Sequence, residues 1–487
     1  MSVSGDNFGD GSAEIRVTGL GFRWCFENYI RRGSQNRFCC SSCFFSSSIT
    51  LTFHCYSLII PCTTTLKCLT YTPNHNNYNN YNTPTTTTMK VLIIGAGIAG
   101  LALALNLSNN GHSVIVIERH NALRTSGLQI DLRGQGIQVL KLMGLDAAFR
   151  EHSVPERGMQ VVDAAGKRWG YFPVNNSGKG KQSFTSEYEI MRVDFCKIMY
   201  GACGSGVEFR FGTTLKTLEE RDGGVHVSFG DGKEEVFDLV VGADGQWSQT
   251  RRMVFGDGGM EMIRDTCVAY FKIDMEGDDF LATMFMAGKG GVMTRRQNEK
   301  QLQVYIGCSS DKVSELKRGD VEAEKDLLAE VFDGAGWKSE EIVSGMRTAE
   351  DFYFERPGLV KLDKWSKGRV VLLGDAAYCP TLMTGMGTTS ALVGAYILAG
   401  EIQKSCEGQV VTDADVAKAL NGYESKLRPF MDAITKRVNT DGGMGFPDSR
   451  LGMMLVLWGM RIATALRLSS LMDVFAIKEI KWELPRY

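Results

Sequence analysis

Residues 89–119 read MKVLIIGAGIAGLALALNLSNNGHSVIVIER, and this stretch decides the fold. Val91–Ile94 is a continuous apolar run bounded by glycine, which predicts a strand buried on both faces. Ala99–Ser108 then predicts a helix, and Ser113–Ile117 predicts a second strand that ends at Glu118. The turn between the first strand and the helix carries the G-x-G-x-x-G spacing, at Gly95, Gly97 and Gly100.

Each part of this unit suits a bound dinucleotide. Gly95 permits the tight turn, Gly97 lets a pyrophosphate approach the backbone, and Gly100 lets the helix pack closely on the strand. The helix N-terminus offers free N–H groups to the phosphates. Glu118 can accept hydrogen bonds from a ribose hydroxyl, which fits FAD or NAD and argues against NADP at this site. The cofactor-binding residues predicted here are Gly95, Gly97, Ala99, Gly100, Glu118 and Arg119.

The composition is that of a globular protein without a strong charge bias. The 487 residues are 44% hydrophobic and 23% charged, with a formal net charge of -2. This balance gives no general attraction to nucleic acid, and we expect no nucleic-acid partner. Six of the 13 cysteines follow Met89, without metal-ligand spacing, so we expect buried thiols in a reducing compartment and no metal site.

The first 88 residues are expected to be a disordered N-terminal extension. Residues 63–88 are rich in Thr, Asn and Tyr and offer little to bury. Residues 38–62 follow three arginines and resemble a diluted signal anchor, but Ser, Thr and Cys interrupt the apolar run. We therefore expect a cytoplasmic protein, with a membrane-associated form as the alternative. The other candidate for membrane contact is 451–477, whose arginines favour packing within the protein instead.

The remaining pattern predicts a β-rich insertion within a nucleotide-binding fold. A hairpin is expected over Met159–Phe172, strands over Val207–Asp244, 265–308 and Arg369–Leu373, and loop over 175–182. The predicted helices are Gln135–Met143, Glu189–Tyr200, Asp320–Phe332, Ser339–Met346, Thr388–Gln403 and Asp413–Val438. The predicted fold class is α/β, a Rossmann-like FAD-binding domain with an inserted β-sheet substrate domain. The expected parts are an FAD-binding domain of 89–154, 186–255 and 361–440, a substrate domain of 155–185 and 256–360, and a C-terminal helical segment of 441–487.

Two further motifs follow apolar strands. GADGQWSQTRR, Gly242–Arg252, places Asp244 in a tight turn, where it binds cofactor or simply caps the turn. In VVLLGDAAYCPTLMTGMGTTSALVGAYILAGE, Val370–Glu401, a strand-end acid precedes a glycine-rich helix start that can cradle an anionic flavin edge. The residues singled out there are Asp375, Pro380, Gly385, Met386 and Gly387.

Together the three motifs resemble those of class A FAD-dependent monooxygenases, the p-hydroxybenzoate hydroxylase-like family. The resemblance spans about 89–440 and is closest to the tetracycline-inactivating monooxygenases and their fungal relatives. It implies that Arg124 contacts NADPH, that Asp131 and Arg192 contact FAD, and that Pro380 lies beside the flavin ring. The glycine turn reads GMG where these relatives usually have GQG, a departure at Met386 that makes substrate inference unsafe.

The resemblance also implies a reaction. FAD would remain bound, NAD(P)H would dock transiently, and O2 would form a flavin C4a-hydroperoxide that hydroxylates a small aromatic or polyketide-like substrate. The sequence names no acid or base: Tyr270, Arg295 and Tyr305 fall on the predicted sheet with core or surface roles equally open. Trp169 and Trp247 are expected to pack, and His112 and His120 to be solvated. The competing readings are an FAD-dependent oxidase or reductase and a non-catalytic flavin-binding redox sensor; a halogenase would need a W-x-W-x-I-P signature that RWGYFP at 168–173 does not supply.

Overall fold

The computed structural model divides the chain into two compact units, Met1–Tyr81 and Asn82–Tyr487. In the first unit it describes one antiparallel pair of short strands, β1 (Leu51–Thr52) and β2 (Thr63–Thr64). In the second it describes residues 88–124, 127, 129–174, 187–296, 298–406, 411–436, 438, 440, 447, 449–466 and 480–487. The predictions for most of 1–87, for the loop at 175–182 and for 467–477 lie outside the described residues.

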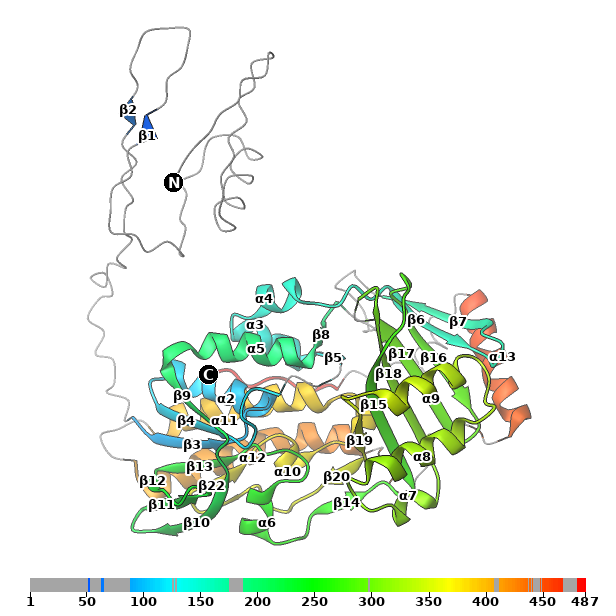
Figure 1. The fold of residues 1–487 in the computed structure, drawn as a ribbon. Coiled ribbons are helices and arrows are strands. Elements are labelled where there is room, and N and C mark those ends of the chain that lie inside the picture. Colours follow the sequence, from blue (N-terminus) through cyan, green and yellow to red (C-terminus); the bar gives the residue numbers. More distant parts are fainter. Residues whose placement is uncertain are drawn as a thin grey trace. The chain divides into compact units, whose positions relative to one another are not determined.

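A six-stranded sheet forms the centre of the nucleotide-binding half (Figure 1). Its inner strand β3 (Lys90–Ile94) pairs in parallel with β4 and β13, and only the edge strand β21 runs antiparallel to its neighbour. The order is β21 (Ser366–Lys367), β22 (Val370–Leu372), β13 (Leu239–Gly242), β3, β4 (Ser113–Glu118) and β9 (Val207–Phe211). A parallel sheet must be covered on both faces, and both are covered here.

Alternate residues of β3 enter two different cores. Val91 and Ile93 pack against helices on one face of the sheet, whereas Leu92 and Ile94 pack against a three-stranded antiparallel sheet on the other. The helices of the first face are α2 (Ile98–Asn109), α5 (Arg192–Cys203), α11 (Gly387–Ser405) and α12 (Asp413–Thr435). The small sheet is β10 (Leu215–Arg221), β11 (Gly224–Phe229) and β12 (Glu234–Phe237). This burial explains the unbroken apolar run at 91–94.

A seven-stranded sheet forms the second half, on the right in Figure 1. Its order is β19 (Tyr353–Glu355), β15 (Thr266–Asp274), β18 (Gln301–Ser309), β17 (Gly290–Arg296), β16 (Ala282–Ala287), β6 (Gly158–Val162) and β7 (Arg168–Pro173). Helices α8 (Val321–Phe332) and α9 (Ser339–Thr348) bury their apolar sides on one face. The chain is therefore α/β, with a β-rich insertion beside a Rossmann-like sheet, as predicted.

The second unit also contains shorter elements. They are β5 (Gln129–Asp131) paired with β8 (Glu189–Met191), β14 (Met260–Met262) paired with β20 (Gly358–Val360), and the helices α3 (Gln135–Leu142), α4 (Asp146–Glu151), α6 (Gln249–Phe255), α7 (Lys312–Glu315) and α10 (Asp375–Tyr378).

The C-terminal part contains one described helix, α13 (Arg450–Ala465), which packs on β7 through Leu457 and Met460. Residues 480–487 form no helix, and Trp482 lies against Phe430 of α12, with ring centroids 4.8 Å apart. Among the described residues, no helix is long and apolar enough to cross a bilayer.

Two local predictions were wrong. Glu189–Met191 was expected to begin a helix, but these residues form β8 because they pair with β5, 60 residues earlier in the chain. His112 was expected to be solvated, but it is buried and accepts a hydrogen bond from the Met89 N–H at 3.3 Å. Burial lowers the pKa of His112. The six cysteines of the second unit are free and buried, as predicted.

Candidate functional site

The glycine loop between β3 and α2 leaves the start of the helix open. Gly95 has φ +109°, and a Cβ there would lie 2.6 Å from the Ala243 carbonyl oxygen. A Cβ at Gly100 would overlap the Gly95 carbonyl oxygen, whereas the nearest atom to one at Gly97 is 3.7 Å away, on Arg192. Gly97 is the N-cap of α2, no side chain caps the helix, and its first turn carries no acid. The free N–H groups of such an N-terminus suit a phosphate.

Glu118 at the end of β4 is bound to the same loop. One carboxylate oxygen accepts a hydrogen bond from the Ala96 N–H at 3.0 Å, and the other accepts one from the His120 N–H at 3.0 Å. These bonds hold the carboxylate beside the glycine turn, at the carboxyl end of the parallel sheet.

Asp244 organises the second motif. Its carboxylate accepts hydrogen bonds from the Ser248 hydroxyl at 2.5 Å and from the N–H and hydroxyl of Thr250, each at 3.0 Å. The buried Arg251 then donates to the carbonyl of Ala376 in α10 at 3.0 Å. Asp244 therefore caps this turn, and the hydrogen bond of Arg251 connects the second motif to the third.

Asp375 begins α10, directly after Gly374. Gly374 has φ +66°, and a Cβ there would lie 2.9 Å from the Ala99 side chain, so the third motif touches the first. Desolvation raises the pKa of Asp375, and the Cys379 thiol and the charge of Arg192 oppose that rise. A carboxyl placed this way is suited to hydrogen bonding with a neutral hydroxyl-bearing ligand.

All but two of the predicted residues line one cavity of about 780 Å³ between the two halves. Gly100 and Met386 are not among its lining residues: Gly100 packs against β3, and Met386 is buried in the core beneath the helices. The predicted residues that line the cavity are Gly95, Gly97, Ala99, Glu118, Arg119, Arg124, Asp131, Arg192, Asp244, Asp375, Pro380, Gly385 and Gly387.

The opposite wall of this cavity comes from the seven-stranded sheet. Tyr270, Met293, Arg295 and Tyr305 lie there, and the Tyr270 and Tyr305 rings meet edge to face at 5.6 Å. Trp247, expected to pack, lines the cavity as well, with the Arg318 guanidinium 3.7 Å from its ring centroid. One space thus joins a nucleotide-binding loop to an aromatic wall.

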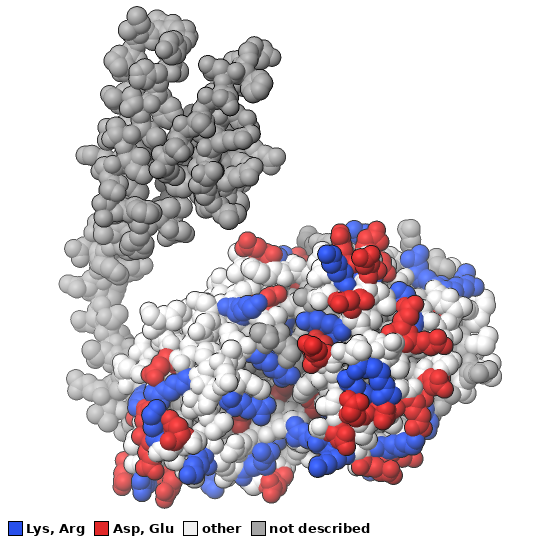
Figure 2. Space-filling view, in the orientation of Figure 1, with Lys and Arg blue, Asp and Glu red and all other residues white. Residues whose placement is uncertain are grey.

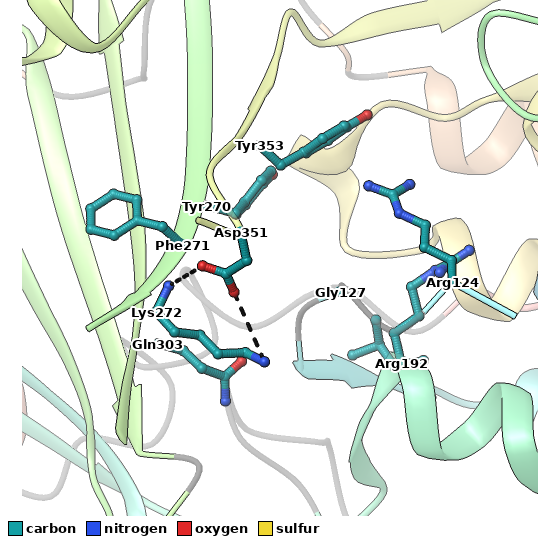
Figure 3. A pocket seen from close by; sticks show the side chains of 10 residues that line it. Arg124, Gly127, Arg192, Tyr270, Phe271, Lys272, Gln303, Asp351 and Tyr353 are labelled. Carbon is teal, nitrogen blue, oxygen red and sulfur yellow. Dashed lines mark hydrogen bonds and ion pairs between the residues drawn. The ribbon is translucent and has the colours of Figure 1, made fainter. Parts of the chain in front are cut away.

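A side pocket of about 180 Å³ adjoins this cavity (Figure 3). Arg124 and Arg192 face it from the nucleotide-binding half, and the Arg124 guanidinium lies 4.8 Å from the Tyr353 ring centroid. Lys272 on the opposite wall is close to Asp351, with 3.9 Å between their charged atoms. The pocket therefore combines an aromatic surface with two arginines, which suits an anionic, ring-containing ligand.

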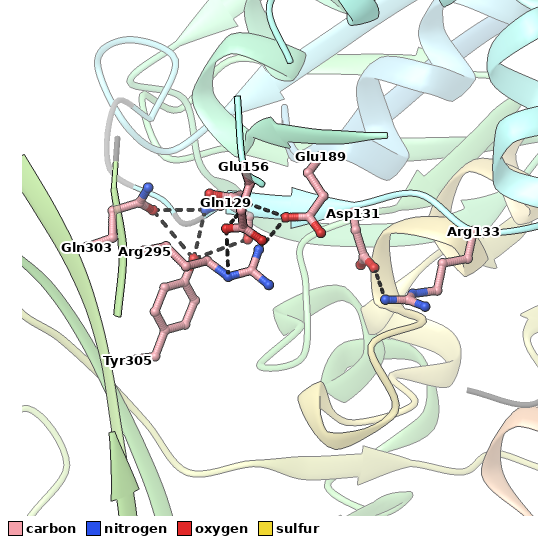
Figure 4. A network of polar contacts seen from close by, with 8 residues as sticks. All are labelled: Gln129, Asp131, Arg133, Glu156, Glu189, Arg295, Gln303 and Tyr305. Atoms are coloured by element: carbon pink, nitrogen blue, oxygen red, sulfur yellow. Dashed lines mark hydrogen bonds and ion pairs between the residues drawn. The ribbon is translucent and has the colours of Figure 1, made fainter. Parts of the chain in front are cut away.

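A buried polar network joins β5 and β8 to the sheet (Figure 4). Arg295 donates a hydrogen bond to Glu189, and its Nε lies 3.6 Å from Glu156. Gln129 donates to both carboxylates through its side chain and donates its backbone N–H to the Gln303 amide oxygen and the Tyr305 hydroxyl, each at 3.2 Å.

Two carboxylates share one guanidinium in this network. Burial raises the pKa of Glu156 to about 7; Arg295 opposes the rise and the nearby Glu189 adds to it. Buried polar atoms that have no hydrogen-bond partner remain on Gln129 (Oε1), Glu156 (Oε1) and Gln303 (Nε2). Sequence reasoning missed this network, because no spacing relates Glu156, Glu189 and Arg295.

Comparison with known proteins identifies the family. An FAD binding domain model matches residues 88–438. The FAD-dependent monooxygenase asL4 of Sarocladium schorii is 42% identical over 422 residues, which cover 82% of this chain and 98% of that protein. The chain belongs to the FAD-dependent monooxygenases.

Other relatives agree with this assignment. The flavin-dependent monooxygenase eupH of a Phoma species is 38% identical to this monooxygenase, over 76% of the chain and 90% of the relative. The crystal structure of tetracycline destructase Tet(51) superposes with a TM-score of 0.64 at 30% identity, covering 82% of this chain and all of that one. The monooxygenase is thus a class A flavoprotein enzyme with FAD as its cofactor.

The residues of the cavity fit FAD. The uncapped start of α2 and the open space at Gly97 would take the pyrophosphate, and Glu118 would take a ribose hydroxyl at the loop. Asp375, Pro380 and the glycine turn line the same cavity and would hold the flavin ring. When bound, FAD supplies hydride acceptance and the activation of O2.

Proposed function

We propose that this monooxygenase uses NAD(P)H and O2 to hydroxylate a small aromatic or polyketide-like substrate. The observation that carries the proposal is the single cavity in which the nucleotide-binding residues face an aromatic wall. The overall reaction consumes substrate, O2, NAD(P)H and a proton and yields hydroxylated substrate, water and NAD(P)+. One oxygen atom of O2 enters the product and the other leaves as water.

The residues on the sheet side of the cavity suit a planar, oxygenated substrate. Tyr270 and Met293 offer flat and polarisable surfaces, and Arg295, which lines the same space, carries donor N–H groups. The structural likeness to tetracycline destructase Tet(51) supports a polycyclic ring system. Because Met386 is buried rather than lining the cavity, the glycine turn would approach the ring through its backbone.

The side pocket supports transient docking of the reductant. Arg124 would pair with an anionic part of NAD(P)H while Tyr353 offers a ring for stacking, and Arg192, which also lines the main cavity near Gly97, would contact FAD. The remaining cofactor-binding assignments, at Asp131 and Arg119, are part of the same proposal. Asp131 is ion-paired with Arg133, which holds it at the cavity wall. The free, buried cysteines support a reducing compartment, and we propose the cytoplasm.

The test is oxygen-isotope transfer with the purified chain. The protein should bind FAD stoichiometrically, and a panel of phenols and polyketide-like aromatics should contain compounds that accelerate NAD(P)H oxidation. Under ¹⁸O2, mass spectrometry should find one labelled atom per product. Release of hydrogen peroxide equal to the NAD(P)H consumed would instead show an oxidase. FAD binding with no turnover across the panel would favour the non-catalytic redox sensor.

A further inference from the structure

Helix α13 is apolar on two opposite sides. One side packs on β7 through Met453, Leu457 and Met460. The other side, together with the C-cap Leu466, exposes six apolar side chains, each between 48% and 70% accessible: Leu451, Met454, Leu455, Trp458, Ile462 and Leu466. With 3.6 residues per turn, these six positions fall within an arc of about 120°. A continuous apolar stripe of this kind marks an interaction surface.

Basic side chains flank the stripe and converge on Trp169 of β7. The charged ends of Arg461 and Lys167 lie 5.5 Å and 5.4 Å from the Trp169 ring, and Trp458 meets it edge to face at 5.6 Å. The adjacent Arg168 is exposed. The acid bound to this cluster is Asp163, which accepts a hydrogen bond from the Trp169 indole N–H at 2.6 Å. Two cations, Lys167 and Arg461, therefore lie over the ring that this carboxylate binds, and the guanidinium of Arg168 lies 5.5 Å from the neighbouring Tyr171 ring.

Helix α13 itself contains no Asp or Glu, and its two charged residues are arginines. Sixteen residues span about 24 Å, shorter than the ~30 Å hydrocarbon core of a bilayer. The helix therefore cannot span a membrane, but it has the features of a helix that lies along one: an apolar face, tryptophan and flanking basic residues. Figure 2 shows an uncharged surface at the edge where Figure 1 places α13, with Lys or Arg side chains beside it.

We propose that the exposed stripe of α13 docks this enzyme on an anionic lipid surface. The positive charge beside the stripe favours a lipid surface over a second copy of the chain as its partner. A two-fold contact would place the stripe against itself and bring the flanking cations of both copies together, with Asp163 as the one acid bonded to each cluster among the described residues. Anionic headgroups would instead meet Lys167, Arg168 and Arg461 while the apolar side chains enter the upper bilayer.

Vesicle flotation of the full chain tests the proposal. The probes are phosphatidylcholine vesicles with and without 30 mol% phosphatidylserine, at 0.1 M and 0.5 M salt. We expect the protein to float with the anionic vesicles, less with the neutral ones, and less at high salt because salt screens the basic cluster. The variant Leu455→Glu/Ile462→Glu should reduce the floating fraction about tenfold or more, since it places two carboxylates in the stripe.

The matched control is Leu142→Glu, which adds a charge at an equally exposed leucine on α3 and should float as the parent does. FAD content and thermal unfolding of every variant show that the fold is intact, and substrate turnover is not required for any readout. Failure of the parent to float with anionic vesicles would overturn the proposal. Concentration-dependent dimers in light scattering that the stripe variant abolishes, without vesicle binding, would overturn it in favour of a second copy.

Discussion

Arg295 of the seven-stranded sheet donates a buried hydrogen bond to Glu189, the first residue of β8 beside the nucleotide-binding fold. This contact crosses from one half of the enzyme to the other, next to the cavity that both halves line. Because Glu156 lies 3.6 Å from the same guanidinium, Arg295 offers its positive charge to two buried carboxyl groups.

We predict that Arg295→Met destabilises the protein by about 3 kcal/mol or more, since it removes the guanidinium that faces two buried carboxyl groups, Glu189 and Glu156. Chemical denaturation at pH 7.5 measures this loss. Adding Glu189→Gln and Glu156→Gln to the same chain should recover most of it, because the uncompensated charges are then absent. Equal destabilisation in the single and triple variants would show that Arg295 acts through packing alone.

The raised pKa of Glu156 predicts a pH-dependent stability. The folded protein holds this proton up to about pH 7, whereas the unfolded chain releases it near the ordinary value of 4.5. Stability from this group is therefore complete below pH 4.5 and is lost as the pH rises toward and through 7, at about 1.4 kcal/mol per unit. Urea unfolding between pH 5 and 8 should show this decline.

Glu156→Gln should flatten that pH dependence, because the amide is neutral throughout the range. The exposed Glu219→Gln, on β10, serves as the matched control and should keep the parental slope. If the Glu156→Gln variant retained the full decline in stability between pH 5 and 7, the pH dependence would belong to another group.

Alanine substitutions at two glycines of the loop should have different effects, one on FAD binding and the other on stability. Gly97→Ala meets no atom closer than 3.7 Å, so the apoprotein should unfold at the parental temperature while its FAD affinity falls about tenfold or more. Gly100→Ala overlaps the Gly95 carbonyl and should lower the unfolding temperature of the apoprotein itself. Calorimetry and FAD fluorescence titration separate the two effects. Tight FAD binding by the Gly97→Ala variant would show that the pyrophosphate does not bind at this loop.

Arg124→Gln should weaken the binding of NAD(P)H and leave FAD bound. Because Arg124 lies over Tyr353 in the side pocket, we expect KM for NAD(P)H to rise about fivefold to twentyfold, with kcat and flavin content unchanged. Stopped-flow reduction of the bound flavin gives the affinity directly. Lys404→Gln, at the far end of α11, is the control. An unchanged KM in the Arg124 variant would exclude this pocket as the docking site.

The nucleotide-binding half was predictable because its signals are local. The apolar run at 91–94, the glycine spacing and the acid at 118 all lie within 30 residues, and each constrains the backbone directly. The hairpin at 159–172 and the strands between 265 and 308 also followed from alternating patterns and turn residues.

The failures share a long-range cause. Strand β8 was taken for the first turn of a helix because its partner, β5, lies 60 residues earlier and supplies no local signal. For Arg295 and Tyr305 a core or surface role was left as open as a role in the reaction, because an alternating strand pattern does not show which other part of the protein packs on each face of the sheet. Their place at the cavity follows from the packing of the sheet against β5 and β8.

The strand order of the nucleotide-binding sheet has a consequence for biosynthesis. Strand β3 is needed at the middle of the sheet, yet its neighbour β13 begins at residue 239 and β22 at residue 370. At ribosomal speed the first delay alone is on the order of ten seconds, far longer than hydrophobic collapse requires. The apolar strands β3 and β4 are exposed on the nascent chain during that interval, so we expect the yield of native enzyme to depend on chaperones.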